Sequence, residues 1–296
     1  MTKDAFLWRI LGVLALFMIV ILFYELALRG WHLRWGTADI EAYRVFPGDE
    51  IIPNPNIEST RAITINASAT KVWPWLVQMG QGRAGFYSYD WLENLIGCDI
   101  HSESRVVPEF QNLKVGDEIR LGPDGYPFYT VAEILPGKSL VLLGGKDVET
   151  GINTWVFVID SLGQDSSRLI VRTRYSYVLK AANILMWRVL TEIAHFVMER
   201  KMMIGIKQRA EGTQKSQAYD FIQVLLWMMT SLALFIAFIS ILIRKLWWRP
   251  LAVATLSMAV LIFQLFRQPP VLFGVILDIG IITALIWAFS CASKGD

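Results

Sequence analysis

A basic side chain, a phenol and a carboxylate lie close together in the first half of the sequence, just after a glycine-rich run. Arg83, Tyr87 and Asp90 are the members of this group, and their types suit them to hold a polar ligand. A guanidinium binds carboxylate or phosphate through two parallel hydrogen bonds, so Arg83 is a candidate to clamp an anionic group. The alternative is a purely structural ion pair of Arg83 with Asp90 or Glu93.

The sequence has three histidines, His32, His101 and His195. No two of these histidines lie one helical turn apart, and we expect neither a conventional metal site nor a cofactor. His101, with Asp90 or Glu109, is a candidate for general acid–base chemistry. His195 lies among Met and Phe residues of a predicted long helix, where it either faces a ligand cavity or has a structural role.

Methionines recur along the same predicted helix, at Met186, Met198, Met202 and Met203. The unbranched thioether side chain adapts to ligands of varied shape. Met198 and Met202 are therefore candidate ligand-binding residues together with His195. The alternative is that the methionines belong to an ordinary core.

The run from Gly80 through Gly82 to Gly85 matches the glycine pattern of dinucleotide-binding loops. That pattern requires a strand before it and a helix after it within a βαβ unit. Here a proline-containing helix is predicted before the run and strands are predicted to follow. We therefore expect a connection between two helices in which the glycines adopt positive φ angles.

Two further sets of charges are expected to be structural. Arg172 and Arg174 share one face of a predicted strand, because side chains alternate along a strand. That face is expected to be outward and solvated; turned inward, it would form a polar floor for an acidic ligand. The run Glu199-Arg200-Lys201 is predicted to be partly a solvated helix face.

A predicted α+β domain positions these residues. A strand is expected at 61–65 and short helices at 71–79 and 89–96, the second with Asp90 and Glu93 spaced as a capping box. Alternating runs bounded by turn residues predict strands at 115–121, 128–135, 140–143, 154–159 and 168–177. Short turns imply antiparallel pairing. A long helix over 184–211 would then lie against the sheet and leave a cleft.

Several stretches of this region are similar to those of a known superfamily: PGDE at 47–50, STRAITI at 59–65, VWPWLVQMGQGRAGFYSYD at 72–90, MERKMM at 198–203, GIK at 205–207 and RAE at 209–211. The chain resembles the START-like superfamily, also called SRPBCC or helix-grip, in its polyketide cyclase/dehydrase-type branch and a bacterial subgroup of it. The resemblance covers approximately 37–212. It implies an antiparallel sheet wrapped on a long C-terminal helix with a hydrophobic ligand cavity, and the superfamily includes both carriers and cyclases.

Apolar blocks at the two ends enclose this domain, and hydrophobic residues make up 54% of the chain. A spanning helix needs about 20 mostly apolar residues, and such segments are predicted at 5–28, 221–243, 247–266 and 271–292, with the helix-grip domain at 35–215. We expect a multi-pass integral membrane protein, and the resemblance to a bacterial subgroup implies the bacterial cell membrane. The basic loop residues leave the side of the domain open. Asp278, within the last segment, is either functional or paired with Arg267 or Gln264.

A formal net charge of +2 gives no sign of a nucleic-acid partner. Cys98 and Cys291 lie in different regions and provide no disulfide framework. The preferred function is binding of an apolar or amphipathic, lipid-like small molecule next to a bilayer. Two alternatives stay open: a cyclase/dehydratase-type enzyme that uses the same cavity, and a regulatory interaction module for a membrane partner.

Overall fold

The computed structural model describes residues 3–145, 151–177 and 191–290. The chain divides into two compact units. The sheet unit runs from Gly30 to Lys215, and the apolar-helix unit combines the residues up to Arg29 with those from Ser216 onward. Each unit has a hydrophobic core of its own. Met186 and Cys291 of the sequence analysis lie outside the described residues.

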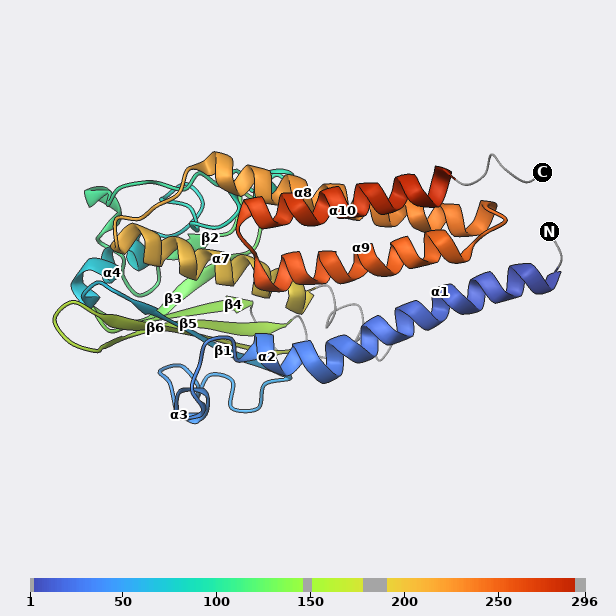
Figure 1. Cartoon of the computed structure of the whole chain (residues 1–296). Coiled ribbons are helices and arrows are strands. Elements are labelled where there is room, and N and C mark those ends of the chain that lie inside the picture. The colour runs from blue at the N-terminus through green and yellow to red at the C-terminus, as the bar shows by residue number, and fades with distance from the viewer. Residues whose placement is uncertain (1–2, 146–150, 178–190, 291–296) are drawn as a thin grey trace. The chain divides into compact units, whose positions relative to one another are not determined.

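Six strands form one antiparallel sheet (Figure 1). They are β1 (Ile57–Ile65), β2 (Glu118–Arg120), β3 (Phe128–Leu135), β4 (Ser139–Gly145), β5 (Ile152–Ser161) and β6 (Ser167–Ser176). The spatial order is β1-β6-β5-β4-β3-β2, so β2 to β6 form a meander and β1 pairs with β6. The predicted antiparallel sheet is therefore confirmed, and the predicted bounds of β3 agree with the observed ones.

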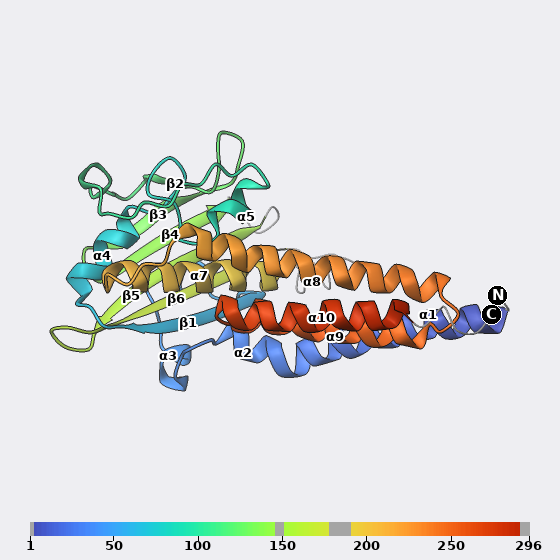
Figure 2. The same ribbon diagram turned by 45° about the horizontal axis from the view of Figure 1, so that its top comes forward.

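Helix α7 (Glu192–Ala210) lies along one face of the sheet, as Figures 1 and 2 show. The short helices α4 (Ala69–Val77) and α5 (Asp90–Asn94) precede the meander, with a single 3-10 turn, η2, at Pro108–Phe110. On the α7 side, alternate strand residues form the core with the helices: Leu140, Leu142, Phe157, Ile159, Leu169 and Val171. The architecture is thus α+β, as predicted.

Gly205 lets α7 approach the loop before α5. A Cβ atom built on Gly205 would lie 2.2 Å from the carbonyl oxygen of Tyr87. Tyr87 has a φ of 58°, a backbone conformation that residues other than glycine rarely adopt. Its hydroxyl donates to the Trp75 carbonyl oxygen at 3.1 Å and accepts from Gln78 Nε2 at 2.9 Å. A side chain at position 205 would therefore push the helix away from a loop that the core holds in place.

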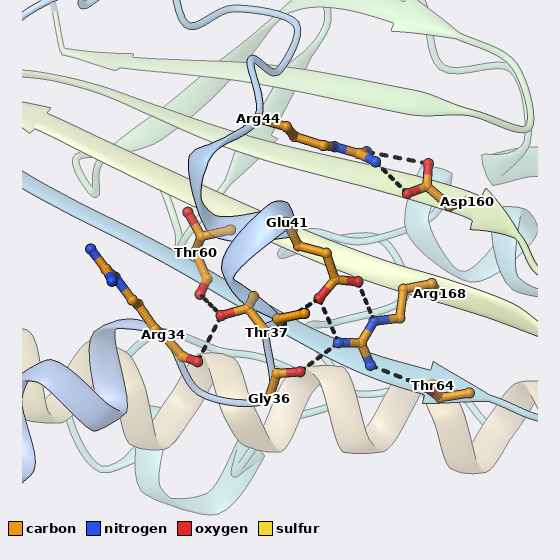
Figure 3. Close-up of polar contacts among 10 residues, drawn as sticks. Arg34, Gly36, Thr37, Glu41, Arg44, Thr60, Thr64, Asp160 and Arg168 are labelled. Atoms are coloured by element: carbon orange, nitrogen blue, oxygen red, sulfur yellow. Dashed lines mark hydrogen bonds and ion pairs between the residues drawn. The ribbon is translucent and has the colours of Figure 1, made fainter.

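The opposite face of the sheet is covered by the segment that contains α3 (Asp39–Tyr43). Figure 3 shows two ion pairs that fix this segment: Glu41 Oε1 lies 2.7 Å from Arg168 Nε, and Asp160 Oδ2 lies 2.6 Å from Arg44 Nη1. Phe46 forms a second, smaller core there with strand residues that point away from α7: Ala62, Val141, Val156, Val158 and Ile170. The sheet is thus buried on both faces along its central strands.

Arg172 points to this second core, so the expectation of a solvated arginine face is wrong. Arg172 is 2% exposed, and its Nη1 donates to Asp49 Oδ2 at 2.7 Å. Its Nη2 donates to the Ala42 carbonyl oxygen at 2.6 Å, and the guanidinium lies over the Phe46 ring. Arg174 also pairs with Asp49, at 3.2 Å. Neither arginine forms a cavity floor, because both face away from α7.

The glycine run forms a tight turn rather than a phosphate-binding loop. Gly80 and Gly85 form an isolated antiparallel bridge. The φ angles are 129° at Gly80, 70° at Gly82 and 68° at Gly85, so the predicted need for positive φ is confirmed. The segment precedes α5 and the meander, and the βαβ context of a dinucleotide site does not occur around it.

The predicted capping box of α5 does not form. Tyr89 is the N-cap residue and makes no side-chain capping hydrogen bond. Asp90 instead accepts from the backbone N–H and the hydroxyl of Ser102, both at 2.6 Å. The carboxylate therefore ties α5 to the loop that follows it rather than to its own first turn.

The apolar-helix unit contains α1 (Lys3–Phe23), α8 (Gln217–Ile243), α9 (Trp248–Arg267) and α10 (Val271–Ser290). A π-helical turn, η1 (Tyr24–Leu28), and α2 (Arg29–Leu33) continue the first of them. Four helical stretches are long and apolar enough to cross a membrane by length and composition: Phe6–Leu33, Gln217–Ile243, Trp248–Arg267 and Val271–Ser290.

Candidate functional site

A cavity of about 430 Å³ lies in the sheet unit, bounded by α7, α5 and the strands. Small-molecule sites are typically about 300–1,000 Å³ and mostly apolar. The apolar part of the wall includes Phe86, Leu92, Leu121, Trp155, Met198 and Met202. The polar side chains among the lining residues are Ser88, Glu93, His195 and Glu199. The cavity thus combines a mostly apolar wall with a few hydrogen-bonding groups.

Glu199 of α7 brings a carboxylate to the cavity wall, and Arg61 of β1 neutralises it. Both side chains are 1% exposed, and Arg61 Nη1 donates to Glu199 Oε2. Glu199 Oε1 accepts from Trp155 Nε1 at 2.9 Å and from Thr173 Oγ1 at 3.1 Å. Burial by itself would raise the pKa of Glu199, but the charge of Arg61 and these hydrogen bonds lower it overall. The carboxylate is therefore ionised and held rigidly.

His195 lies one helical turn before Glu199 and next to the same arginine. Its Nδ1 is 3.2 Å from Arg61 Nη1, and its Nε2 is 3.6 Å from Glu199 Oε1. Because a guanidinium has only donors, Nδ1 must accept, which makes the ring neutral with its proton on Nε2. Burial lowers the pKa of His195, and Arg61 adds to this effect against the opposing Glu199 charge.

Two phenols, Tyr129 and Tyr175, lie beside this polar group and influence each other's ionisation. Burial raises the pKa of Tyr175 to about 12 and that of Tyr129 well above its usual value. Tyr175, Arg61 and His195 line a second, much smaller cavity of about 20 Å³. His195 therefore stands between the two cavities.

Glu93 of α5 supplies a second carboxyl group to the cavity wall. Burial and, to a smaller extent, the negative charge of Asp90 raise its pKa to about 8, and the nearby Ser88 hydroxyl opposes this rise. The Glu93 Oε2 atom is buried and has no hydrogen-bond partner among the described residues. The Ser88 hydroxyl donates to the Met198 carbonyl oxygen at 3.1 Å, so it can accept from a protonated Glu93. Glu93 is therefore mostly a neutral acid at pH 7.

Arg61, Glu199 and Glu93 are not among the predicted site residues, although the sequence carries a signal for the first two. Arg61, Ile63 and Ile65 are two residues apart along β1, so their side chains lie on the same face of the strand. Ile63 and Ile65 belong to the core against α7, which places Arg61 on that side as well. Glu199 lies at helical spacing from His195 and Met202, on the stripe that faces the sheet.

The prediction of a partly solvated helix face at 199–201 is wrong for two of its residues. Glu199 is 2% exposed and Lys201 is 6% exposed. Glu199 is enclosed by Arg61, Trp155 and Thr173, and the Lys201 Nζ lies over the Tyr89 ring. The prediction was based on charge alone. The buried partner of Glu199, Arg61, lies on β1 and is brought to α7 by the folding of the sheet.

Three of the seven predicted site residues line the large cavity: His195, Met198 and Met202. All three belong to α7 and recur at helical spacing, so one face of this helix supplies them. Met203, predicted with them, lies in the core with no exposed surface. The role of the three residues in ligand binding stays a prediction.

The other four predicted residues are not among those that line the cavity. Arg83 Nη2 donates to the carbonyl oxygens of Val77 and Phe110, both at 2.8 Å, rather than to a carboxylate. Tyr87 belongs to the core, and Asp90 is bound to Ser102, as described above. The His101 side chain is 79% exposed and contacts Asp99. A ligand-binding role for these four residues stays a prediction.

Among the described residues, no group of His, Cys, Asp and Glu could hold a metal ion.

Comparisons with known proteins give structural similarity only. No protein-family model matches the sequence, and no curated protein matches it either.

Among solved structures, a truncated norcoclaurine synthase from Thalictrum flavum is 12% identical with a TM-score of 0.33, and the match covers 51% of this chain and 91% of that chain. The Aha1 dimer from Colwellia psychrerythraea is 15% identical with a TM-score of 0.31, over 54% of this chain and 99% of that chain. A hypothetical protein from Helicobacter pylori is 12% identical with a TM-score of 0.35, over 56% and 95% of the two chains.

Proposed function

We propose that the sheet unit is a START-like, helix-grip module that binds an apolar or amphipathic small molecule in the cavity against α7. The observation that carries this proposal is the cavity of about 430 Å³ with a mostly apolar wall. Apolar side chains around a space of this size gain packing contacts and lose contact with water when a hydrophobic molecule packs against them.

The polar groups define which ligands fit best. Glu199 is already neutralised by Arg61 and satisfied by Trp155 and Thr173, so it does not call for a cationic ligand. Glu93 presents a largely neutral carboxyl group with one free oxygen. The best match is a molecule with a long apolar body and one uncharged polar group, such as a hydroxyl or carbonyl, placed near Glu93.

The apolar helices suggest where such a ligand would come from. We propose that the four apolar helices span a bilayer, which makes the chain a multi-pass membrane protein and the bilayer its partner. A binding module tethered to a membrane meets a high local concentration of lipid-like molecules. The side of the membrane on which the sheet unit lies stays open.

Blocking the cavity tests this function. Ala194 lines the cavity and is exposed, so Ala194→Trp would fill the space from its rim with little effect on the core. We expect amphiphiles that co-purify with the full chain in nanodiscs to fall at least about tenfold in this variant, which corresponds to roughly 1.4 kcal/mol of lost binding free energy. Mass spectrometry of the extracted lipids measures the change.

A matched substitution separates cavity binding from lipid bound to the helices. Ala38→Trp places the same side chain on an exposed alanine of the same unit, away from the cavity. This control should keep the amphiphile seen with the unaltered chain. If all three proteins yield the same lipid profile, the cavity does not hold the molecule and the proposal is wrong.

Glu93 supports a second candidate, an enzyme that acts on the bound molecule. A neutral carboxylic acid inside an apolar site can donate a proton to a ligand oxygen. If Glu93 converts the ligand, Glu93→Gln should retain a precursor whose mass differs from that of the molecule bound by the unaltered chain. The same mass in both proteins favours simple binding.

A further inference from the structure

Three polar side chains meet in the interior of the apolar-helix unit, one from each of α8, α9 and α10. Thr230 Oγ1 lies 2.7 Å from Asp278 Oδ1 and 3.0 Å from Gln264 Oε1, and Gln264 Nε2 donates to Asp278 Oδ1 at 3.0 Å. Asp278 is 4% exposed, and Gln264 is one of the two partners that the sequence suggests. Asp278 lies about 10 Å from the start of α10, at 1.5 Å per residue, and so about a third of the way across a 30 Å hydrocarbon core.

When Asp278 is ionised, one of these three contacts has no proton of its own. The Thr230 hydroxyl has a single proton, yet its oxygen lies within hydrogen-bond distance of two acceptor oxygens. A proton on Asp278 Oδ1 resolves this: Asp278 donates to Thr230, Thr230 donates to Gln264 Oε1, and Gln264 Nε2 donates back to Asp278. The closed ring of hydrogen bonds therefore fits a neutral Asp278.

The second carboxyl oxygen of Asp278 is not part of this ring. Asp278 Oδ2 is buried and has no hydrogen-bond partner among the described residues. A buried polar atom without a partner is costly, more so in hydrocarbon than in a soluble core. If Asp278 only joined the three helices, its second oxygen would be expected to find a donor as well.

Asp278 and Thr230 line a cavity of about 170 Å³ between α8 and α10. The rest of its described wall is apolar, and Met229, Leu232 and Ile282 on its rim are at least 40% exposed. The cavity thus opens on the side of these helices that the proposed bilayer would cover. Its only polar groups are Asp278 and Thr230, and Oδ2 is the free acceptor.

We propose that this pocket is a second binding site, which takes the hydroxyl group of a membrane-dissolved amphiphile, with that hydroxyl donating to Asp278 Oδ2. An uncharged donor suits a neutral acid in a low-dielectric surrounding, whereas a cation would need an ionised partner. The apolar wall accommodates the adjoining hydrocarbon. This inference depends on the proposed membrane insertion of the helices and not on ligand binding in the sheet unit.

A hydrophobic carbodiimide tests the site in the full chain, reconstituted in lipid nanodiscs. The O–H of a protonated carboxyl group adds across a C=N bond of dicyclohexylcarbodiimide, and the adduct rearranges to a stable acylurea whose mass is that of the two reactants combined. We expect such an adduct on Asp278 and none at this position in Asp278→Asn; any adduct on Glu93 maps to a different peptide and should be the same in both proteins. Dodecanol should halve the labelling rate at a concentration about fivefold lower than dodecane does, the effect of one net hydrogen bond.

The outcomes separate the possible failures. Equal protection by dodecanol and dodecane would mean an apolar pocket without hydroxyl recognition, and absence of the adduct from the folded chain would mean that Asp278 is not an accessible acid; either result overturns the proposal. If a water-soluble carbodiimide labels Asp278 as fast as the hydrophobic one, the membrane insertion itself is wrong. Should Asp278→Asn fail to fold, the comparison of alcohol and alkane on the unaltered chain still decides.

Discussion

Replacing Arg61 by methionine is expected to destabilise the sheet unit by about 3–5 kcal/mol, because it leaves the Glu199 carboxylate buried without its counter-charge. The two side chains are each 1% exposed, so water cannot replace the lost partner. The Arg61 Nε bond to the His32 carbonyl oxygen, 2.8 Å long, is lost as well. Urea unfolding of the full chain, followed by tryptophan fluorescence, measures the change, with Trp155 as a reporter next to Glu199.

Two further variants show whether buried charge is the cause. Arg61→Met combined with Glu199→Gln should recover most of the loss, since a glutamine oxygen still accepts from Trp155 and Thr173 and no charge is left. Arg44→Met removes a pair with Asp160 whose side chains are 36% and 38% exposed, and it should cost at most about 1 kcal/mol. A small effect of Arg61→Met, similar to that of Arg44→Met, would contradict a buried ion pair.

Glu93→Gln is expected to stabilise the chain in mildly alkaline solution and to leave it unchanged in acid. The folded-state pKa of Glu93, about 8, lies above the ordinary value of 4.5. Below pH 4.5 Glu93 is protonated in both the folded and the unfolded chain, so it does not change the stability there. As the pH rises through this interval, only the unfolded chain releases the proton, and the folded state loses stability until the pH exceeds the folded-state pKa. Glutamine removes this loss, which we expect to be on the order of 3 kcal/mol.

The pH dependence of unfolding from pH 4 to pH 9 measures this effect. Glu93→Gln should lose stability below the ordinary pKa of histidine, 6.5, because burial lowers the pKa of His195 and its protonation is then coupled to unfolding. In the unaltered chain the protonation of Glu93 opposes this loss between pH 4.5 and 6.5, so the loss in acid should be clearer in Glu93→Gln, which should also lack the loss of stability as the pH rises from 4.5 to 8. The exposed Glu109→Gln serves as the control and should follow the unaltered chain. Parallel curves for Glu93→Gln and the unaltered chain would show that Glu93 is solvated.

Local sequence patterns predicted most of the secondary structure because they act over a few residues. Alternation of apolar residues and the turn residues between them placed β3, β4, β5 and β6 within a few residues of their observed bounds. The positive φ angles of Gly80, Gly82 and Gly85 followed from glycine chemistry in the same way. The capping box of α5 failed because Ser102, twelve residues beyond Asp90, competes for the carboxylate.

Short-range patterns were enough to predict an α+β domain between apolar helices, with His195, Met198 and Met202 on one face of α7. Which charges are buried depends on long-range packing. Arg61 and Glu199 are 138 residues apart, and they meet because β1 pairs with β6 and α7 lies over that part of the sheet. Arg172 is buried because the segment around α3 folds over the other face. The residues next to a charged side chain in the sequence do not reveal its distant partner, because burial depends on which elements pack together in the folded chain.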